Sequence, residues 1–596
     1  MSKLKWILDK AAVENEPGLT NAQMMLTNND LRPGENTQGY RISDPPLIYH
    51  SRRGSRRIQR LTNGNRTTVD PERRQWKWIN FIAFWIADSL NINTWMISSS
   101  MIVDGLSWWQ SWICVWVGYF VAAAFVCLIG RIGAIYHISF PVTARASFGI
   151  WGSLWPVLNR VVMAIIWYGV QGYIGGQCVT LMIEAIWPSY RNLHNGLSAS
   201  AGVDTKNFVS FFLFWLLSLP ALWFPVHKVR HLFTAKAIYS PIAAIAFFAW
   251  AISRAHGLGP IIHQSNTVHG SDLSWAIVKG IMSCIGNFAA LIMNNPDFSR
   301  FARTPKDAFW AQLFTIPVGF GVTSFIGIIV SSSSSVIFND GEGYIWNPLD
   351  LLGKFLDGAS SGQRFGIFVI ATGFALAQLG TNISANSISA GTDMTAMLPR
   401  YMTIRRGSYI CAAVGLAMCP WNLLSTSNNF TTYLSAYSVF LSAIAGVMIC
   451  DYYIVRKGYL NIKSLYSASK TDCYYYTCGF SWRAYTAYVC GIMINIVGFA
   501  GAVGRKVPIG AQYIYNFNYF TGVIVSGVVY FALTWFFPVP ETSDTWNEVD
   551  IDVEDISVSY GKDPNDLEAH GYDRRSFDDV VGSDERKGPS TSDRKL

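Results

Sequence analysis

A tryptophan and several carboxamide side chains inside long apolar segments are the residues of this sequence best suited to recognising a ligand. Trp167 and Gln171 are four positions apart, so a helix would present both on one face. Thr381 and Asn386 lie in a second apolar segment, on adjacent faces of another helix. An indole can stack on a flat heterocycle, and carboxamides can pair with the edges of a ring. These residues predict a site for a small planar polar molecule that is carried across a membrane.

An alternative interpretation applies to the same residues. Polar side chains are costly in lipid and usually face a bundle interior or a water-filled cavity. Asn, Gln and Thr also hydrogen-bond between packed membrane helices, where they hold the helices together. Taken one residue at a time, the sequence leaves both interpretations open.

The composition is that of a helical membrane protein. Of 596 residues, 51% are hydrophobic and only 14% are charged, against about 25% charged residues in soluble domains. The ten cysteines show no CxxC spacing and are read as small buried residues. We find no Gly-rich phosphate loop, metal-ligand cluster or Ser/His/Asp arrangement. The sequence therefore predicts an all-α polytopic membrane protein that is not an enzyme and needs no cofactor or metal.

Apolar runs of about 20 residues, the length needed to cross a bilayer, predict twelve transmembrane helices. They lie near 79–103, 109–130, 154–187, 208–225, 233–254, 275–294, 310–332, 366–392, 407–424, 431–450, 483–503 and 518–537. Lys and Arg are concentrated in the even-numbered connections, so the positive-inside rule places both termini in the cytoplasm.

Three regions follow from this count. Residues 1–75 are expected to form a cytoplasmic N-terminal tail, residues 76–540 a twelve-helix transporter domain, and residues 541–596 an acidic cytoplasmic C-terminal tail. The tails are polar, with no aromatic residues interleaved in a basic groove, so no nucleic-acid partner is predicted. Membrane lipids are expected partners, and the arginines at 52–57 could attract anionic headgroups.

Two spans carry polar or Gly-containing interruptions. The first contains Asp88, Asn91 and Asn93, and the sixth contains Gly286-Asn287 and ends in Asn294-Asn-Pro-Asp297. A broken helix would expose backbone groups to a cavity near the membrane midplane, whereas a tolerated kink would leave them satisfied by neighbouring helices. Spans one and six are five apart, as are spans three and eight. A five-plus-five inverted repeat would bring all four to one interface.

Short stretches along the apolar region carry a resemblance to a known family. They are Asn91-Ile-Asn-Thr-Trp95, His137-Ile-Ser-Phe-Pro141, Ala146-Ser-Phe-Gly149, Arg230-His-Leu-Phe-Thr234, Asn287-Phe-Ala-Ala-Leu291, Pro296-Asp-Phe-Ser-Arg300, Ala375-Leu-Ala-Gln-Leu-Gly-Thr-Asn-Ile-Ser-Ala-Asn386, Asp393-Met-Thr-Ala396, Ile404-Arg-Arg-Gly407 and Cys419-Pro-Trp-Asn422. From Trp76 to Pro540, about three-quarters of the chain, the sequence resembles fungal uracil, uridine and allantoin permeases of the nucleobase–cation symporter-1 family. Uracil permeases are the most similar.

The resemblance implies a LeuT-like core of ten helices in two inverted repeats, plus two extra helices. It also implies a substrate site in which the ring stacks on Trp167 and hydrogen-bonds Gln171. The eighth-span asparagine of the family corresponds to Asn386, and the sixth-span aromatic and its neighbour correspond to Phe288 and Asn287.

A bacterial hydantoin relative binds sodium, and the corresponding positions here are Ala87, Leu90, Gly380 and Thr381. Gly380 replaces a hydroxyl residue, which removes one sodium ligand. The fungal resemblance instead implies coupling to protons.

Two carboxylates are candidates for carrying that proton. Asp88 and Asp393 fall within or at the end of predicted spans, and an intramembrane carboxylate is a functional candidate by default. The alternative is that each caps a broken helix or pairs with an arginine. Lys228 is a candidate for a cytoplasmic gate, or a simple anchor at the membrane surface.

The leading hypothesis is a plasma-membrane proton symporter that imports uracil by alternating access, with the ring between Trp167 and Phe288 and its amide edge on Gln171 and Asn386. Allantoin or uridine import is the alternative within the family. A receptor that senses the same ligand without moving it is the alternative from another class. Lys562, Lys587 and Lys595 in the acidic tail resemble the ubiquitin acceptors of fungal permeases, which implies ubiquitin-ligase machinery as a partner.

Overall fold

The computed structural model describes residues 69, 74–224, 226–338 and 343–548, and for residues 199, 226–231 and 233 it describes the backbone alone. Throughout this part of the chain the regular structure is helical, and the β-pairing is confined to isolated bridges at Trp76–Ala302 and Thr477–Phe480. The prediction of an all-α protein is confirmed.

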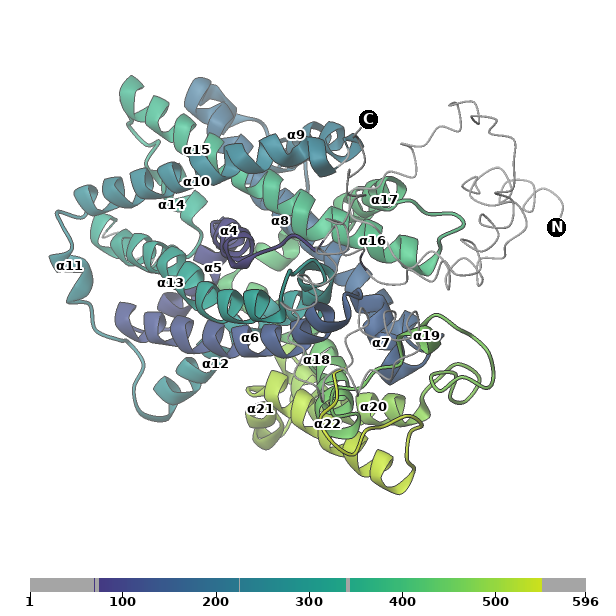
Figure 1. Ribbon diagram of the computed structural model, residues 1–596. Coiled ribbons are helices and arrows are strands. Elements are labelled where there is room, and N and C mark those ends of the chain that lie inside the picture. Colours follow the sequence, from purple (N-terminus) through teal and green to yellow (C-terminus); the bar gives the residue numbers. More distant parts are fainter. Residues whose placement is uncertain (1–68, 70–73, 225, 339–342, 549–596) are drawn as a thin grey trace, which may run out of the picture.

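The helices carry the labels of Figure 1 and begin with α4. They are α4 (Trp78–Ser89), α5 (Ile92–Val103), α6 (Trp108–Tyr136), α7 (Phe140–Phe148), α8 (Leu154–Ile186), α9 (Thr205–Trp223), α10 (Val226–Arg254), α11 (Gly259–Ile262), α12 (Gly270–Ser299), α13 (Pro305–Ile337), α14 (Pro348–Lys354), α15 (Ser361–Thr381), α16 (Ile388–Met397), α17 (Ile404–Ala417), α18 (Ser427–Ile449), α19 (Ile462–Leu465), α20 (Trp482–Ala502), α21 (Ile509–Tyr515) and α22 (Asn518–Phe536). Short 3₁₀ turns occupy η2 (Pro188–Asn192), η3 (Ala199–Ala201) and η5 (Pro420–Leu424), and π-helical turns occupy η4 (Asn382–Ser387) and η6 (Cys450–Val455).

The helices match the predicted spans. Among the described residues, ten helical segments are long and apolar enough to cross a membrane. The other two predicted spans coincide with the pair α4 and α5, at 12 residues each, and with α17, at 14 residues. These helices are too short to qualify alone, and the arrangement is consistent with twelve spans.

The first span is broken where the sequence predicted it. Helix α4 ends at Ser89 and α5 begins at Ile92, with Leu90 and Asn91 between them. The Asn91 side chain accepts a hydrogen bond from the Thr94 amide at 3.0 Å and donates one to the Asp88 carbonyl at 2.6 Å. One side chain thus satisfies a freed donor and a freed acceptor, as an N-cap residue does.

The sixth span is not broken, so of the two interpretations of its Gly-Asn step the tolerated glycine is the one that holds. Helix α12 runs without interruption through Gly286 and Asn287. Gly286 is needed for close packing, because a Cβ there would lie 3.1 Å from the backbone oxygen of Leu434 in α18. Its carbonyl accepts a hydrogen bond from the Tyr437 hydroxyl at 2.7 Å. The glycine therefore lets two helices approach and does not end one.

The second irregularity lies in the eighth span. Helix α15 passes into the π-helical turn η4 at Asn382 and continues as α16. A π turn closes i→i+5 hydrogen bonds and is frequent at functional sites. This turn brings Thr381 and Asn386, which are five residues apart, toward the same side of the helix.

Helix α5 is buried inside the molecule, whereas α4, which overlies the centre in the view of Figure 1, keeps one face exposed. Helices α6, α12 and α13 pack together on one side, with α13 against both α4 and α5. Helix α8 packs on α15 and α9 on the other side, while α18, α20 and α22 form a further group next to α12. The irregular segments therefore face each other across the centre of the bundle.

The predicted tails fall mostly outside the described residues. The arginines at 52–57 and the tail residues Lys562, Lys587 and Lys595 lie there. Residues 541–548 are described, and Glu548 accepts hydrogen bonds from Arg131 of α6 at 2.7 and 2.6 Å. The three-region division itself stays a prediction.

The cap at the broken helix makes a measurable contribution to stability. Replacing Asn91→Ala should lower the free energy of unfolding by about 0.5–2 kcal/mol, the usual cost of losing an N-cap. Asn91→Ser, which keeps an acceptor, should recover most of that loss. The measurement is the melting temperature of the purified protein in detergent. Ser360→Ala, which removes the cap of α15, is the matched control and should cost a similar amount without altering ligand binding.

Candidate functional site

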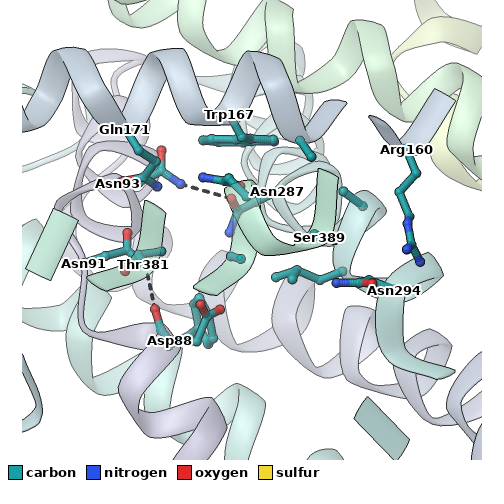
Figure 2. Close-up of a pocket in the computed structure, with 16 residues that line it drawn as sticks. Asp88, Asn91, Asn93, Arg160, Trp167, Gln171, Asn287, Asn294, Thr381 and Ser389 are labelled. Carbon is teal, nitrogen blue, oxygen red and sulfur yellow. Dashed lines mark hydrogen bonds between the residues drawn. The ribbon is translucent and has the colours of Figure 1, made fainter. Parts of the chain in front are cut away.

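A cavity of about 70 Å³ lies between the broken helix, α8, α12, α13 and the π-helical turn. Most of its lining residues carry a hydroxyl, carboxamide or charged group (Figure 2). The lining residues are Asp88, Asn91, Asn93, Arg160, Ala164, Trp167, Gln171, Asn287, Ala290, Leu291, Asn294, Phe320, Thr381, Ala385, Asn386 and Ser389. The structure thus brings together four of the five predicted substrate residues, namely Trp167, Gln171, Asn287 and Asn386.

Trp167 and Gln171 lie on one face of α8, as their spacing predicted. Figure 2 shows the indole edge-on, with Gln171 one turn along the helix and Asn287 on the cavity side of the ring. The back of the indole is supported by Tyr433 and Tyr437 of α18, whose ring centroids lie 5.8 and 6.3 Å away. These edge-to-face contacts fix the plane of the indole, so one face can receive a flat ligand.

A carboxamide pair joins α5 to α12 in the wall of the cavity. Asn93 donates a hydrogen bond to the Asn287 side chain at 3.1 Å, and Asn287 donates one to the Tyr119 hydroxyl at 3.5 Å. Figure 2 shows the first of these bonds near Gln171. The broken first span and the intact sixth span are thereby tied together at the level of the site.

The π-helical turn places a second carboxamide pair opposite α8. Asn382 donates to the backbone oxygen of Tyr168 at 3.1 Å, and Asn386 donates to the Asn382 side chain at 3.0 Å. Asn382 therefore fixes the turn against α8, and Asn386 lines the cavity. The sequence motif suggested Asn386, whereas nothing in it indicated the extra residue in the turn.

Four buried polar atoms in the cavity wall have no hydrogen-bond partner in the described part of the protein. They are the carboxamide oxygens of Asn93, Gln171 and Asn294 and the Nη1 atom of Arg160. Leaving a buried polar group unpaired costs about 1–3 kcal/mol. Such groups are normally satisfied by protein or water, so their convergence on one cavity marks a site built for a polar occupant.

Phe288 does not line the cavity, which contradicts its predicted role as a stacking partner. The side chain is fully buried, with its ring stacked on Trp85 at 5.6 Å and in edge contact with Tyr119 and Phe320. Asn287 turns toward the cavity, and the next residue on an intact helix points about 100° away from it. Phe320 of α13 is the aromatic residue that reaches the cavity from this side.

Two of the positions where the resemblance places a cation, Gly380 and Thr381, lie against a lysine. The Lys236 ammonium of α10 donates to the Thr381 hydroxyl at 2.7 Å, and its charge acts on Asp88. Gly380 leaves room for the lysine stem, because a Cβ there would lie 2.9 Å from Lys236 Cδ. Lys236 is buried, and it occupies the side of Gly380 that a larger residue would fill. Gly380 and Lys236 therefore fit together, because the glycine leaves the space that the lysine stem fills.

Of the remaining predicted cation and proton positions, Ala87, Leu90 and Asp88 lie on or next to α4. Ala87 is half-buried on α4 and does not line the cavity. Leu90 sits in the helix break and faces a different groove, next to α13. Asp88 does line the cavity.

Asp393 is paired with a buried arginine, as the alternative interpretation anticipated. Arg160 of α8 donates to both carboxylate oxygens of Asp393, with Nε 2.6 Å from Oδ2, and its Nη2 lies 2.7 Å from Asp297 Oδ2. Asp297 also accepts from the Phe140 amide at 2.9 Å, and the guanidinium stacks on the Phe140 ring. This cluster joins α7, α8, α12 and α16 at one end of the cavity.

Lys228 lies in the first turn of α10, and its side chain is among those not described. Its role as a gate stays a prediction.

Sequence reasoning missed Arg160 and Lys236. Both are charged residues within predicted spans, so the rule that singled out Asp88 could have singled them out too.

The Arg160 cluster gives a stability prediction. Arg160→Met would leave Asp297 and Asp393 buried without their cation, and breaking a buried pair in this way costs about 3–5 kcal/mol. We expect a strongly lowered melting temperature, partly restored by combining Arg160→Met with Asp393→Asn. The matched control is Arg191→Met, because Arg191 pairs with the exposed Asp357 and exposed pairs contribute at most about 1 kcal/mol. Its second carboxylate, Glu184 at 3.7 Å, keeps Lys206 as a partner. Equal melting temperatures for the two arginine variants would contradict the prediction.

Comparison with known proteins places this cavity in context. The family model described as permease for cytosine/purines, uracil, thiamine, allantoin matches residues 68–522. The allantoin permease of Saccharomyces cerevisiae is 48% identical over 81% of this chain and 77% of its own length, and the uracil permease of that yeast is 48% identical over 80% and 77%. Its uridine permease is 44% identical over 87% and 83%.

A solved structure shares the fold. It is a nucleobase–cation symport-1 family transporter in a closed conformation with bromovinylhydantoin bound. The two chains have a TM-score of 0.64 and 19% identity, over 80% of this chain and 96% of that one. The predicted five-plus-five inverted-repeat core is confirmed by this likeness.

Proposed function

The chain belongs to the nucleobase–cation symporter-1 family, the permeases for cytosine and purines, uracil, thiamine and allantoin, and we propose that it imports uracil by proton symport. The family consists of multi-pass permeases and not of enzymes, in agreement with the sequence analysis. The substrate, the coupling ion and the membrane are the parts that we propose here.

The observation that carries the proposal is the set of unpaired polar atoms beside the indole. Three carboxamide oxygens and one guanidinium nitrogen are buried and unpaired in residues that line a cavity of which Trp167 forms one side. A planar ring that offers N–H donors and carbonyl acceptors would satisfy these atoms while stacking on the indole, which adds about 0.5–1.5 kcal/mol beyond area burial. An analogue that lacks one of these hydrogen-bonding edges leaves a buried polar group of the protein unpaired. This loss is the strongest means by which such a site can discriminate between substrates.

A single ring is favoured over a nucleoside by size. The cavity of about 70 Å³ is small, and a ribose would require the helices to move further apart than a single ring does. Allantoin is the alternative, because its ureide edges present the same donors and acceptors and a permease for it is as similar in sequence as the uracil permease. Alternating access would carry the bound ring inward past a site that stays fixed.

Two carboxamides on opposite walls provide the test of the site. Gln171→Ala and Asn386→Ala should each abolish uptake of radiolabelled uracil in a transport-null host, while the protein still reaches the cell surface. Gln363→Ala, at the exposed start of α15, is a matched carboxamide control and should transport normally. Competition with unlabelled uracil, allantoin, uridine and thiamine ranks the substrates. Full uptake by surface-expressed Asn386→Ala would rule out the proposed site, and label that binds without accumulating would indicate a receptor.

Proton coupling is supported by Lys236, which lies against the positions where the family resemblance places a cation. An ammonium group hydrogen-bonded to Thr381 already supplies the positive charge that a bound sodium ion would supply. The Lys236 ammonium would repel a second cation bound next to Thr381. Asp88, which lines the cavity and feels the charge of Lys236, is the group best placed to exchange a proton with it.

Coupling can be measured independently of substrate binding. Uptake should increase as the external pH falls, stop when a protonophore is added and be unchanged when sodium is replaced by choline. Lys236→Gln should lose accumulation against a gradient and its response to pH, while uracil still binds the purified protein. Lys470→Gln, in an exposed loop, is the control and should behave as wild type. Sodium-dependent uptake by the wild-type protein would overturn the assignment of the coupling ion.

The proposed location is the plasma membrane with both termini in the cytoplasm. Basic residues support this orientation. Arg131, Arg300 and Arg456 lie near or just after the C-terminal ends of α6, α12 and α18, which are even-numbered spans and so end on the same side of the membrane. A proton gradient directed into the cell would drive a symporter of this kind to import its substrate.

A further inference from the structure

A groove of about 370 Å³ runs between α4 and α13 on the outside of the helix bundle. Its walls are Ile82 and Ile86 of α4 and Phe314, Val318 and Val322 of α13. The wall residues of each helix are four positions apart, so each wall is a continuous ridge along its helix. The groove is deep because its floor is formed by Gly319, which has no side chain and packs against Ser89. A Cβ on the glycine would lie 3.1 Å from the serine hydroxyl.

The groove opens outward from the bundle, and its walls are apolar. Ile86, Phe314, Val318 and Val322 are 44–58% exposed. The last three belong to α13, which is long and apolar enough to cross a membrane, and Ile86 belongs to α4, the first half of the broken first span. From Phe314 to Val322 the ridge extends over eight residues, about 12 Å at 1.5 Å per residue. This is a narrow apolar channel parallel to the helices, a shape that suits a single extended hydrocarbon chain.

Exposed cations surround the cytoplasmic end of the groove. Lys77 precedes α4, while Arg303 and Lys306 stand at the start of α13. The two segments are joined by backbone hydrogen bonds, in which Trp76 donates to Phe301 at 2.9 Å and Arg303 donates to Trp76 at 2.8 Å. The nearby carboxylate of Asp307 is already engaged by the Trp78 amide and the Thr304 hydroxyl.

The cations lie beyond the apolar walls, on the headgroup side of the groove. Lys77 precedes Ile82 by five residues, about 7.5 Å along a helix, and Lys306 precedes Phe314 by eight residues, about 12 Å, a gap that the long lysine side chain can shorten. The polar part of one leaflet is about 5–8 Å thick, from a bilayer of 40–45 Å with a 30 Å core. Basic pockets beside membrane helices on the cytoplasmic side bind anionic headgroups.

We propose that the groove between α4 and α13 is a binding site for one anionic phospholipid of the cytoplasmic leaflet. One acyl chain lies between the ridges that contain Ile86 and Val318, and the phosphate-bearing headgroup contacts Lys77, Arg303 and Lys306. Sterols lack the anionic headgroup that these three cations fit, so the site takes a phospholipid.

The groove and the substrate cavity lie on opposite sides of one broken turn. Ser89 and Leu90 line the groove, while Asp88 and Asn91 line the cavity. A lipid that holds α4 against α13 therefore also holds the two cavity residues in place. The lipid contacts none of the cavity residues directly.

Native mass spectrometry of the purified full chain tests the site without relying on transport. The protein is titrated with phosphatidylserine or phosphatidylcholine, and the populations carrying a bound lipid are measured. Wild type should retain phosphatidylserine in preference to phosphatidylcholine. Lys77→Gln and Lys306→Gln should each weaken phosphatidylserine binding about fivefold, because one basic residue near the headgroup contributes about 1 kcal/mol. Lys470→Gln should leave the preference intact.

Filling the groove tests where the acyl chain lies. Val318→Trp should abolish the bound phosphatidylserine peak, and Val322→Trp provides a second variant if the first does not fold. Val528→Trp is the matched control, because Val528 is equally lipid-facing on α22, 61% exposed and outside the groove. Equal lipid retention by Val318→Trp and Val528→Trp would overturn the proposal. So would equal binding of the two phospholipids by wild type, or displacement of phosphatidylserine by ergosterol. Glycerophosphoserine, which has no acyl chains, should not compete.

Discussion

Backbone groups surrounded by lipid must find hydrogen-bond partners inside the protein, and the break between α4 and α5 is where this requirement shapes the molecule. Two residues leave the helix, and the Asn91 side chain bonds the Asp88 carbonyl before the break and the Thr94 amide after it. The break turns Asp88 and Asn91 toward the cavity and Ser89 and Leu90 toward the groove beside α13. The cavity forms where α8, α12 and the π-helical turn close around Asp88 and Asn91. Asn93 and Asn287 then connect the broken helix to the intact one.

The sequence was sufficient for those features that depend on local spacing. Trp167 and Gln171 share a face because four residues make about one helical turn, whatever surrounds the helix. The break in the first span could be predicted because three polar residues within seven positions cannot all face lipid. The apolar runs located the long helices, while the orientation inferred from the basic residues stays a prediction. Each of these inferences rests on the properties of a single segment.

Features that depend on neighbouring helices could not be predicted in this way. A glycine such as Gly286 can mark a helix break. Here it instead allows close packing against the backbone of α18, which is distant in sequence. Phe288 follows a cavity residue, but its direction depends on the ring cluster of Trp85, Tyr119 and Phe320. Gly380 and Lys236 are explained only as a pair, because the lysine stem fills the space beside the glycine. A single sequence contains no sign of which residues meet across helices.

The π-helical turn has a consequence for the permitted length of the chain. A π turn holds one residue more than an α turn, so deleting one residue between 382 and 387 would allow a regular helix to form. The six residues of the π turn sweep about the same angle as five α-helical residues, so α16 would keep its orientation and Asp393 would still meet Arg160. The deletion would remove only the wider turn, which brings Thr381 and Asn386 to the cavity and sets Asn382 against α8. The extra residue is therefore required by the cavity and not by the rest of the helix.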